Sequence, residues 1–313
     1  MKKSFAVAFF VIVLCGLLVV PLLLKPPSVA SQGEQQITPK ITPSPDMKIV
    51  PEETPQSTPQ PDSTPTISPQ PTQQTSNDKL EGTINKAINF MAQTQEPYAL
   101  LMLNVLYRRF GITEFKDTLQ RYDKILSSCN QPLLKVYRRI ADHNNTADET
   151  DFNAVVDIMD IITVPALYSD QSSPPENYPS VLINAKNSGG YMMTHALLAT
   201  IWLQENNCNI SLPEYFMETL YHDTAALTER SIPVTDDAIE AAAFLYQAGQ
   251  GNLVHPDFAE NVIAAQNSDG GWSWVSGTPN DSDWHPSVLA LMFLLHVKYP
   301  ATSYSPMLAP ALG

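Results

Sequence analysis

The sequence predicts an all-α domain of paired helices, which follows a long N-terminal extension. Apolar residues recur at helical spacing through residues 79–313, and sustained alternation with a two-residue period is missing there. A short glycine-containing motif also occurs twice in the second half of the chain, each time after one helix and before the next. Repeated helix pairs of this kind are typical of stacked or closed α/α arrays.

The chain begins with a segment that has the character of a membrane anchor. Residues 5–24 are an apolar run, with Lys2 and Lys3 before it and Lys25 after it. About 20 apolar residues cross a bilayer, and N-terminal lysines favour an outside C-terminus. We therefore expect residues 1–25 to be a signal-anchor, with the cell membrane as the partner of residues 5–24. The protein would cross the membrane once and have its C-terminal domain outside the cytoplasm. A signal peptide cleaved near residue 30, giving a secreted chain, is the alternative.

Residues 26–78 are expected to form a disordered linker. They are rich in Pro, Thr, Ser and Gln and contain no aromatic residue, so they cannot bury enough apolar surface to order themselves.

Outside the cell, sequons at Asn144, Asn209 and Asn280 could carry sugars, which predicts a glycoprotein. The net charge of −14 argues against a nucleic-acid partner.

The rest, residues 79–313, is expected to form one helical domain. Helices starting near residues 97, 191, 236 and 285 are apolar almost all round, whereas those near 80, 211 and 256 are amphipathic. This difference predicts an inner and an outer layer of helices. The expected helices cover residues 80–93, 97–111, 114–128, 132–143, 151–163, 179–187, 193–207, 211–227, 236–249, 256–267 and 285–298.

One motif carries a family resemblance. Gln266, Gly270 and Trp272 fit the pattern of Gln, three residues, Gly, one residue and Trp, and a degenerate copy lies at residues 186–191. The pattern resembles the repeat of the prenyltransferase and squalene-cyclase superfamily. The resemblance implies an α/α toroid, here an incomplete barrel of the α6/α6 type, in which Gln266, Gly270, Gly271 and Trp272 have a structural role.

The resemblance also implies where a site would lie. In such toroids the N-terminal ends of the inner helices line a central cavity, which would bring together Asp236, Asp237, His195 and His285 as catalytic candidates. Asp283, Trp284 and Tyr191 are the expected ligand-binding residues. The family's cyclases use an Asp-x-Asp-Asp motif whose first acid is Val234 here, so a non-cyclase member is expected. Helix capping is the alternative role for Asp236 and Asp237.

Two classes of function follow. The first is a membrane-tethered module that binds an apolar or glycan ligand in its cavity. The alternative is an acid/base enzyme that acts on an isoprenoid or polysaccharide through Asp236, Asp237, His195 and His285. A zinc site from these residues is chemically reasonable, but the cysteine that the related protein prenyltransferases use is missing. We therefore expect no metal and no cofactor.

Overall fold

The computed structural model describes residues 71–129, 131–229, 232–277, 282–301 and 304–310. The expected anchor, most of the expected linker and the sequon at Asn280 lie outside these residues. Within them the protein is all-helical, as predicted, with two isolated β-bridges and no strand. None of the described helices combines the length and the apolar character needed to span a bilayer. The described residues belong to one compact unit, which contains every element discussed below.

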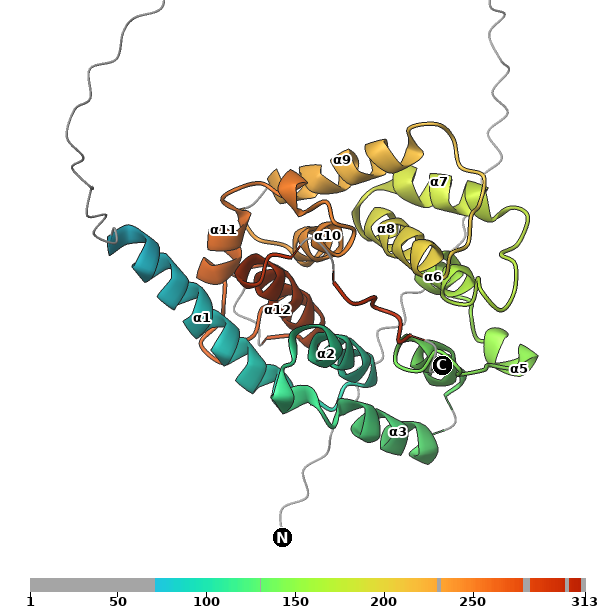
Figure 1. Ribbon diagram of the computed structural model, residues 1–313, viewed down its shortest axis with the longest axis horizontal. Helices are drawn as coiled ribbons and strands as arrows, with labels where there is room; N and C mark the ends of the chain where they lie inside the picture. The colour runs from blue at the N-terminus through green and yellow to red at the C-terminus, as the bar shows by residue number, and fades with distance from the viewer. Residues whose placement is uncertain (1–70, 130, 230–231, 278–281, 302–303, 311–313) are drawn as a thin grey trace, which may run out of the picture. The chain divides into compact units, whose positions relative to one another are not determined.

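Six helices surround the centre of this unit (Figure 1). Neighbours pack in the order α6, α8, α10, α12, α2 and α4. Helices α8 and α12 are buried over nearly their whole length, which explains why their sequences are apolar all round. The inner helices are α2 (Pro97–Phe110), α4 (Pro132–Tyr137), α6 (Ile158–Leu167), α8 (Gly190–Glu205), α10 (Asp236–Gln247) and α12 (Trp284–Lys298).

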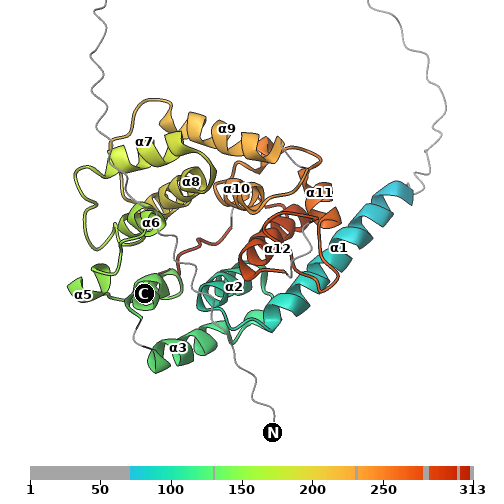
Figure 2. The ribbon, with the colours of Figure 1, turned by 180° about the vertical axis from the view of Figure 1, so that it is seen from behind.

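Amphipathic helices lie outside them, and Figure 2 shows the same arrangement from behind. Helix α1 packs on α12, α3 on α2, α5 on α4, α7 on α8, α9 on α10 and α11 on α12. The outer helices are α1 (Pro71–Ala92), α3 (Thr118–Ser128), α5 (Glu149–Phe152), α7 (Tyr178–Ser188), α9 (Phe216–Glu229) and α11 (Phe258–Ala264), and 3-10 turns lie at Thr113–Phe115, Arg138–Ile140 and Gly251–Leu253.

Polar contacts connect the α4 region to α6 and the turn that follows it. The buried Arg139 donates from Nε to the carbonyl of Leu167 at 2.9 Å and forms an ion pair with Asp170. The hydroxyl of Tyr168 donates to the carbonyl of Val136 at 2.8 Å. The series of inner helices is therefore joined between its first and last members.

Two expected boundaries differ from the structure. Helix α1 begins at Pro71, before the domain boundary expected at residue 79; proline is well suited to a first turn. The helix expected over residues 151–163 is two helices, and α6 continues through Pro165 instead of ending before it. An interior proline costs about 3 kcal/mol, but continuing the helix buries Ala166 and Leu167 completely.

The glycine-rich motif joins α11 to both α1 and α12. The side-chain amide of Gln266 donates to the carbonyls of Thr83 and Gly270, each at 2.9 Å. The indole N–H of the buried Trp272 donates to the carbonyl of Val262 at 2.8 Å, and its backbone N–H donates to Ser287 Oγ at 2.8 Å. These bonds place the end of one helix pair against the start of another.

The cysteines Cys129 and Cys208 are free.

Replacing Gly270 by alanine should destabilise the protein. Gly270 has a φ of +99°, and a Cβ there would lie 2.6 Å from the carbonyl oxygen of Lys86, while Gly82 in helix α1 has open space around its Cα. We expect Gly270→Ala to lower the free energy of unfolding by about 1–3 kcal/mol, and the control Gly82→Ala to raise it by about 0.5–1 kcal/mol. Urea denaturation measures both; equal stability of Gly270→Ala and the native chain would contradict the assignment.

Candidate functional site

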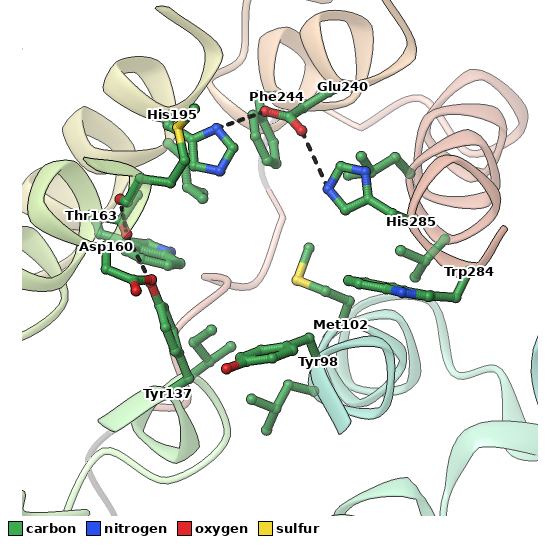
Figure 3. A pocket seen from close by; sticks show the side chains of 17 residues that line it. Tyr98, Met102, Tyr137, Asp160, Thr163, His195, Glu240, Phe244, Trp284 and His285 are labelled. Atoms are coloured by element: carbon green, nitrogen blue, oxygen red, sulfur yellow. Dashed lines mark hydrogen bonds and ion pairs between the residues drawn. The ribbon is translucent and has the colours of Figure 1, made fainter. Parts of the chain in front are cut away.

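A cavity of about 200 Å³ lies among the inner helices, mainly near their N-terminal ends. Figure 3 shows its side chains, which come from α2, α4, α6, α8, α10 and α12. Most of the lining is aliphatic or aromatic. The aromatic residues are Tyr98, Tyr137, Trp202, Phe244 and Trp284, and the ionisable acids and histidines are Asp160, His195, Glu240 and His285.

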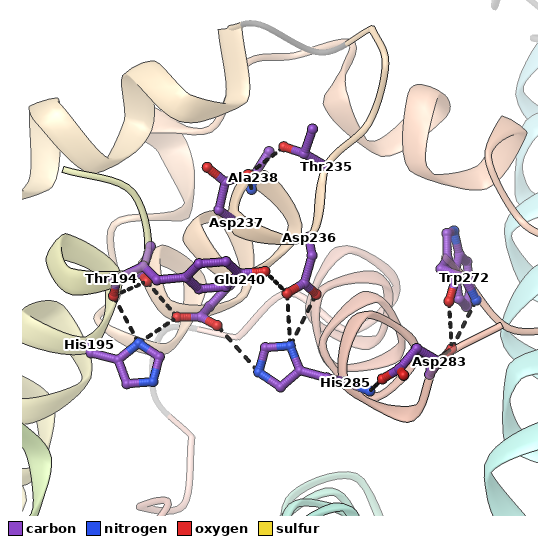
Figure 4. A network of polar contacts seen from close by, with 12 residues as sticks. Thr194, His195, Thr235, Asp236, Asp237, Ala238, Glu240, Trp272, Asp283 and His285 are labelled. Atoms are coloured by element: carbon purple, nitrogen blue, oxygen red, sulfur yellow. Dashed lines mark hydrogen bonds and ion pairs between the residues drawn. The ribbon is translucent and has the colours of Figure 1, made fainter. Parts of the chain in front are cut away.

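Four ionisable side chains form a continuous series, and three of them, His195, Glu240 and His285, line the cavity (Figure 4). His285 Nδ1 lies 2.8 Å from a carboxylate oxygen of Asp236, and its Nε2 lies 3.5 Å from Glu240 Oε2. The other oxygen of Glu240 lies 3.1 Å from Nδ1 of His195. Both carboxylates are buried, with Glu240 at 0% exposure. The structure thus brings together Asp236, His285 and His195 through Glu240, which was not predicted as a site residue.

The helical repeat explains why Asp236 and Glu240 act together. Residues four apart lie on the same face of a helix, so both carboxylates of α10 face the imidazoles of α8 and α12. Asp236 begins the helix, and its backbone N–H donates to the carbonyl of Trp274 at 2.9 Å. The four-residue spacing from Asp236 was the sequence signal that could have identified Glu240.

Neighbouring hydroxyl groups complete the network. Tyr191 donates to Asp236, and Thr194 donates to Glu240. Burial and then the charge of Asp236 raise the pKa of Tyr191, so its phenol stays protonated. His195 Nδ1 also lies 2.8 Å from the backbone carbonyl of Tyr191, a group that can only accept. Nδ1 of His195 therefore carries a proton, and its Nε2 points towards the cavity (Figure 3).

Electrostatics keeps this network charged. Burial lowers the pKa of His195, but the adjacent Glu240 outweighs burial and the net pKa is raised. His285 follows the same pattern, with Asp236 as the main opposing group, and its pKa is also raised. Burial raises the pKa of Glu240, but the two histidines outweigh it and the net pKa is lowered. The groups therefore stabilise one another as ion pairs.

A third acid, Asp160, lines the cavity on the same side as His195 (Figure 3). Asp160 accepts a hydrogen bond of 2.6 Å from the hydroxyl of Tyr137, and burial raises the pKa of its carboxyl group. Asp160 faces the cavity because α6 begins at Ile158 and presents its first turn there. The sequence did not single it out, because residues 151–163 were expected to form one uninterrupted helix.

The remaining predicted residues divide into two groups. Trp284 lines the cavity, and Asp283 caps α12 by accepting from the backbone N–H of His285 at 2.9 Å. Asp237 takes no part in the network: its carboxylate accepts from the hydroxyl of Thr235 and from the N–H of Ala238. On α10, Glu240 and not Asp237 therefore joins Asp236 in the network.

One group in the described part of the chain could hold a metal ion. Asp236, Glu240 and His285 each offer a ligand atom, and these atoms all lie within 4.8 Å of one another. Carboxylate and imidazole ligands suit zinc. Binding would require His285 to release a proton that it now shares with a carboxylate. The expectation that the protein needs no metal remains a prediction.

Comparison with known proteins identifies no relative. The chain matches no protein-family model, no curated protein and no solved structure. The resemblance to the prenyltransferase and squalene-cyclase superfamily therefore depends on the residues of the motif alone.

The histidine–carboxylate network should make stability depend on pH in both directions. The raised pKa values of His195 and His285 contribute stability that is complete below about 6.5 and lost as the pH rises through the folded values. The lowered pKa of Glu240 contributes stability that is complete above about 4.5 and lost as the pH falls through the folded value. Urea midpoints measured across this range should therefore show a maximum.

Glu240→Gln tests the origin of this maximum. Removing one partner of a buried ion pair should cost about 3 kcal/mol near neutral pH, and less at alkaline pH, where the histidines are neutral. His222→Gln, at an exposed histidine on α9, is the control and should keep the native profile. An unchanged profile in Glu240→Gln would show that these contacts do not set the pH dependence.

Proposed function

We propose that the domain binds a small, mostly apolar molecule in its central cavity. The observation that carries the proposal is the cavity itself: about 200 Å³ among the inner helices, with mostly apolar and aromatic walls and a few convergent polar groups. A dry cavity of about 150 Å³ is known to hold benzene, so this one has room for roughly a ring and a few more atoms. Its size and lining favour an apolar ligand over a glycan chain.

We infer that the helical arrangement is an α/α toroid with six inner and six outer helices among the described residues. The inner helices follow one another around the cavity, and outer helices pack behind them. The glycine-rich motif joins successive pairs, as in the family that the sequence resembles. The chain lacks the first acid of the cyclase motif because Val234 is there, and Asp237 is bonded to Thr235, so a non-cyclase member is favoured.

The His195–Glu240 contact favours acid/base catalysis as a second function. A carboxylate that holds Nδ1–H of an imidazole leaves Nε2 to exchange a proton with a bound molecule. Asp160, whose pKa is raised by burial, provides a further acid in the same cavity. On this alternative, His195, Asp236 and His285 act with Glu240 on an isoprenoid-like substrate, and the cavity is too small for a polysaccharide.

Filling the cavity tests the binding function. Toluene should bind the native chain saturably, as seen by NMR shifts of cavity-lining methyl groups, because it fits the apolar volume. Met102→Trp and the smaller change Leu198→Phe should weaken this binding at least about ten-fold, since both positions line the cavity. Tyr215→Trp, at a residue that is 65% exposed, is the control. Unaltered binding in folded cavity variants, checked by circular dichroism, would contradict the proposal.

A second experiment on the native chain and a cavity variant distinguishes binding from catalysis. A ligand found by this route is recovered after incubation and analysed by mass spectrometry. Conversion by the native chain, but not by a His195→Gln variant that still binds, would assign catalysis to His195. Recovery of unchanged ligand from both would favour a binding module.

We propose that residues 5–24 tether the domain to the membrane, facing outward. Their length and the lysines before them support this placement. The full chain should remain with membranes during alkaline carbonate extraction, and a chain without residues 1–25 should be released, as measured by immunoblotting. A shortened mature chain in the medium would instead identify residues 1–30 as a cleaved signal peptide.

A further inference from the structure

We propose that the ligand of the central cavity is a small organic cation, an amine or quaternary ammonium ion held between aromatic rings and buried carboxylates. The inference rests on the proposed binding function and names the chemical class of its ligand. It depends on three observations: the arrangement of the aromatic rings, the balance of charge around the cavity, and the kinds of polar group in the lining.

Aromatic rings form a corner on one side of the cavity. The rings of Tyr98 and Tyr137 meet edge to face, with centroids 5.7 Å apart and planes at 82°. Trp284 lines the same cavity, and its ring meets that of His285 edge to face, with centroids 5.2 Å apart (Figure 3). Rings set at steep angles around a space are the usual receptors for quaternary ammonium groups, which the negative ring faces attract. Burial raises the pKa of Tyr98 to about 12, so this phenol stays neutral at physiological pH.

The charge around the cavity is negative. The lining contains Asp160 and Glu240, and Asp236 adjoins it through its ion pair with His285. Three carboxylates against two imidazoles leave one negative charge in excess even with both histidines protonated. Among the described lining residues there is no lysine or arginine to balance it. A monovalent cation would restore neutrality.

The carboxylates also outweigh the helix dipoles. The inner helices present N-terminal ends near the cavity, and a helix N-terminus by itself attracts anions. Asp160 and Asp236 lie in the first turns of α6 and α10, where they offset that partial positive charge. Burial raises the pKa of Asp160, and a cation close to this carboxylate would reverse that effect. The side of the cavity with Asp160 and Tyr137 is therefore suited to a positive group.

The test compares a cation with its neutral carbon analogue on the full chain. Benzyltrimethylammonium and neopentylbenzene have nearly the same shape and differ in charge. Fluorescence of Trp202 and Trp284, which line the cavity, reports binding of either probe. We expect the ammonium ion to bind at least about ten-fold more tightly.

Two matched pairs of variants assign the contacts. Asp160→Asn should weaken binding of the ammonium ion about ten-fold and leave neopentylbenzene unaffected, whereas Asp223→Asn, at an exposed carboxylate on α9, should change neither. Trp284→Leu should also weaken cation binding, and Trp284→Phe should keep most of it because a ring remains.

The outcomes separate the two proposals. Equal affinity for the two probes, or an Asp160→Asn variant indistinguishable from Asp223→Asn, would overturn the cation assignment and keep the binding function. No binding of either probe, or of toluene, would overturn both.

Discussion

The burial of Glu240 between two histidines is the constraint on which the centre of the protein depends. A carboxylate with 0% exposure is strongly unfavourable unless its charge is paired and its oxygens accept hydrogen bonds. His195 and His285 provide the charges, and Thr194 provides a hydroxyl donor. Because these partners lie on α8 and α12, the requirements of one side chain on α10 fix the relative positions of three inner helices.

The two ends of the inner helices have different chemistry. At the C-terminal ends, Glu205 accepts from the backbone N–H groups of Met307 and Leu308 at 2.8 and 3.0 Å, which holds this terminal segment in the interior. His296, at that end of α12, is buried beside Arg109, and burial lowers its pKa to about 4, so it is neutral. Among the histidines of the inner helices, those whose pKa is raised, His195 and His285, therefore lie at the end that contains the aromatic cavity.

The general arrangement could be predicted because it depends on local patterns. Helices that are apolar all round must be buried, and the buried lengths of α8 and α12 agree with this. It was harder to predict which residues belong to the candidate site, because this depends on the direction in which each side chain points. Asp236 and Asp237 are adjacent, but neighbours on a helix point about 100° apart, so one meets His285 and the other bonds to Thr235.

Asp160 shows a different limit of prediction. Its place at the cavity could be predicted only with the correct bounds of α6. This helix begins after the cap at Asp157 and continues through Pro165. The burial of Ala166 and Leu167 decides that continuation, and such packing is set by distant segments. Glu240 was easier to predict from the sequence, since its four-residue spacing from Asp236 places both side chains on the same face of the helix. A search for paired acids at helical spacing would have found it.

The network has one further implication. Replacing a buried ion pair by well-packed apolar residues is often neutral or stabilising, so such a pair is weak evidence for a role in stability. Three of the four ionisable groups of the network, His195, Glu240 and His285, line one cavity, and the fourth, Asp236, is paired with His285. Glu240 Oε2 even lacks a hydrogen-bond partner among the described atoms. The gathering of these groups at one cavity is better explained by what they offer a molecule inside it, whether a compensating charge or a site for proton exchange.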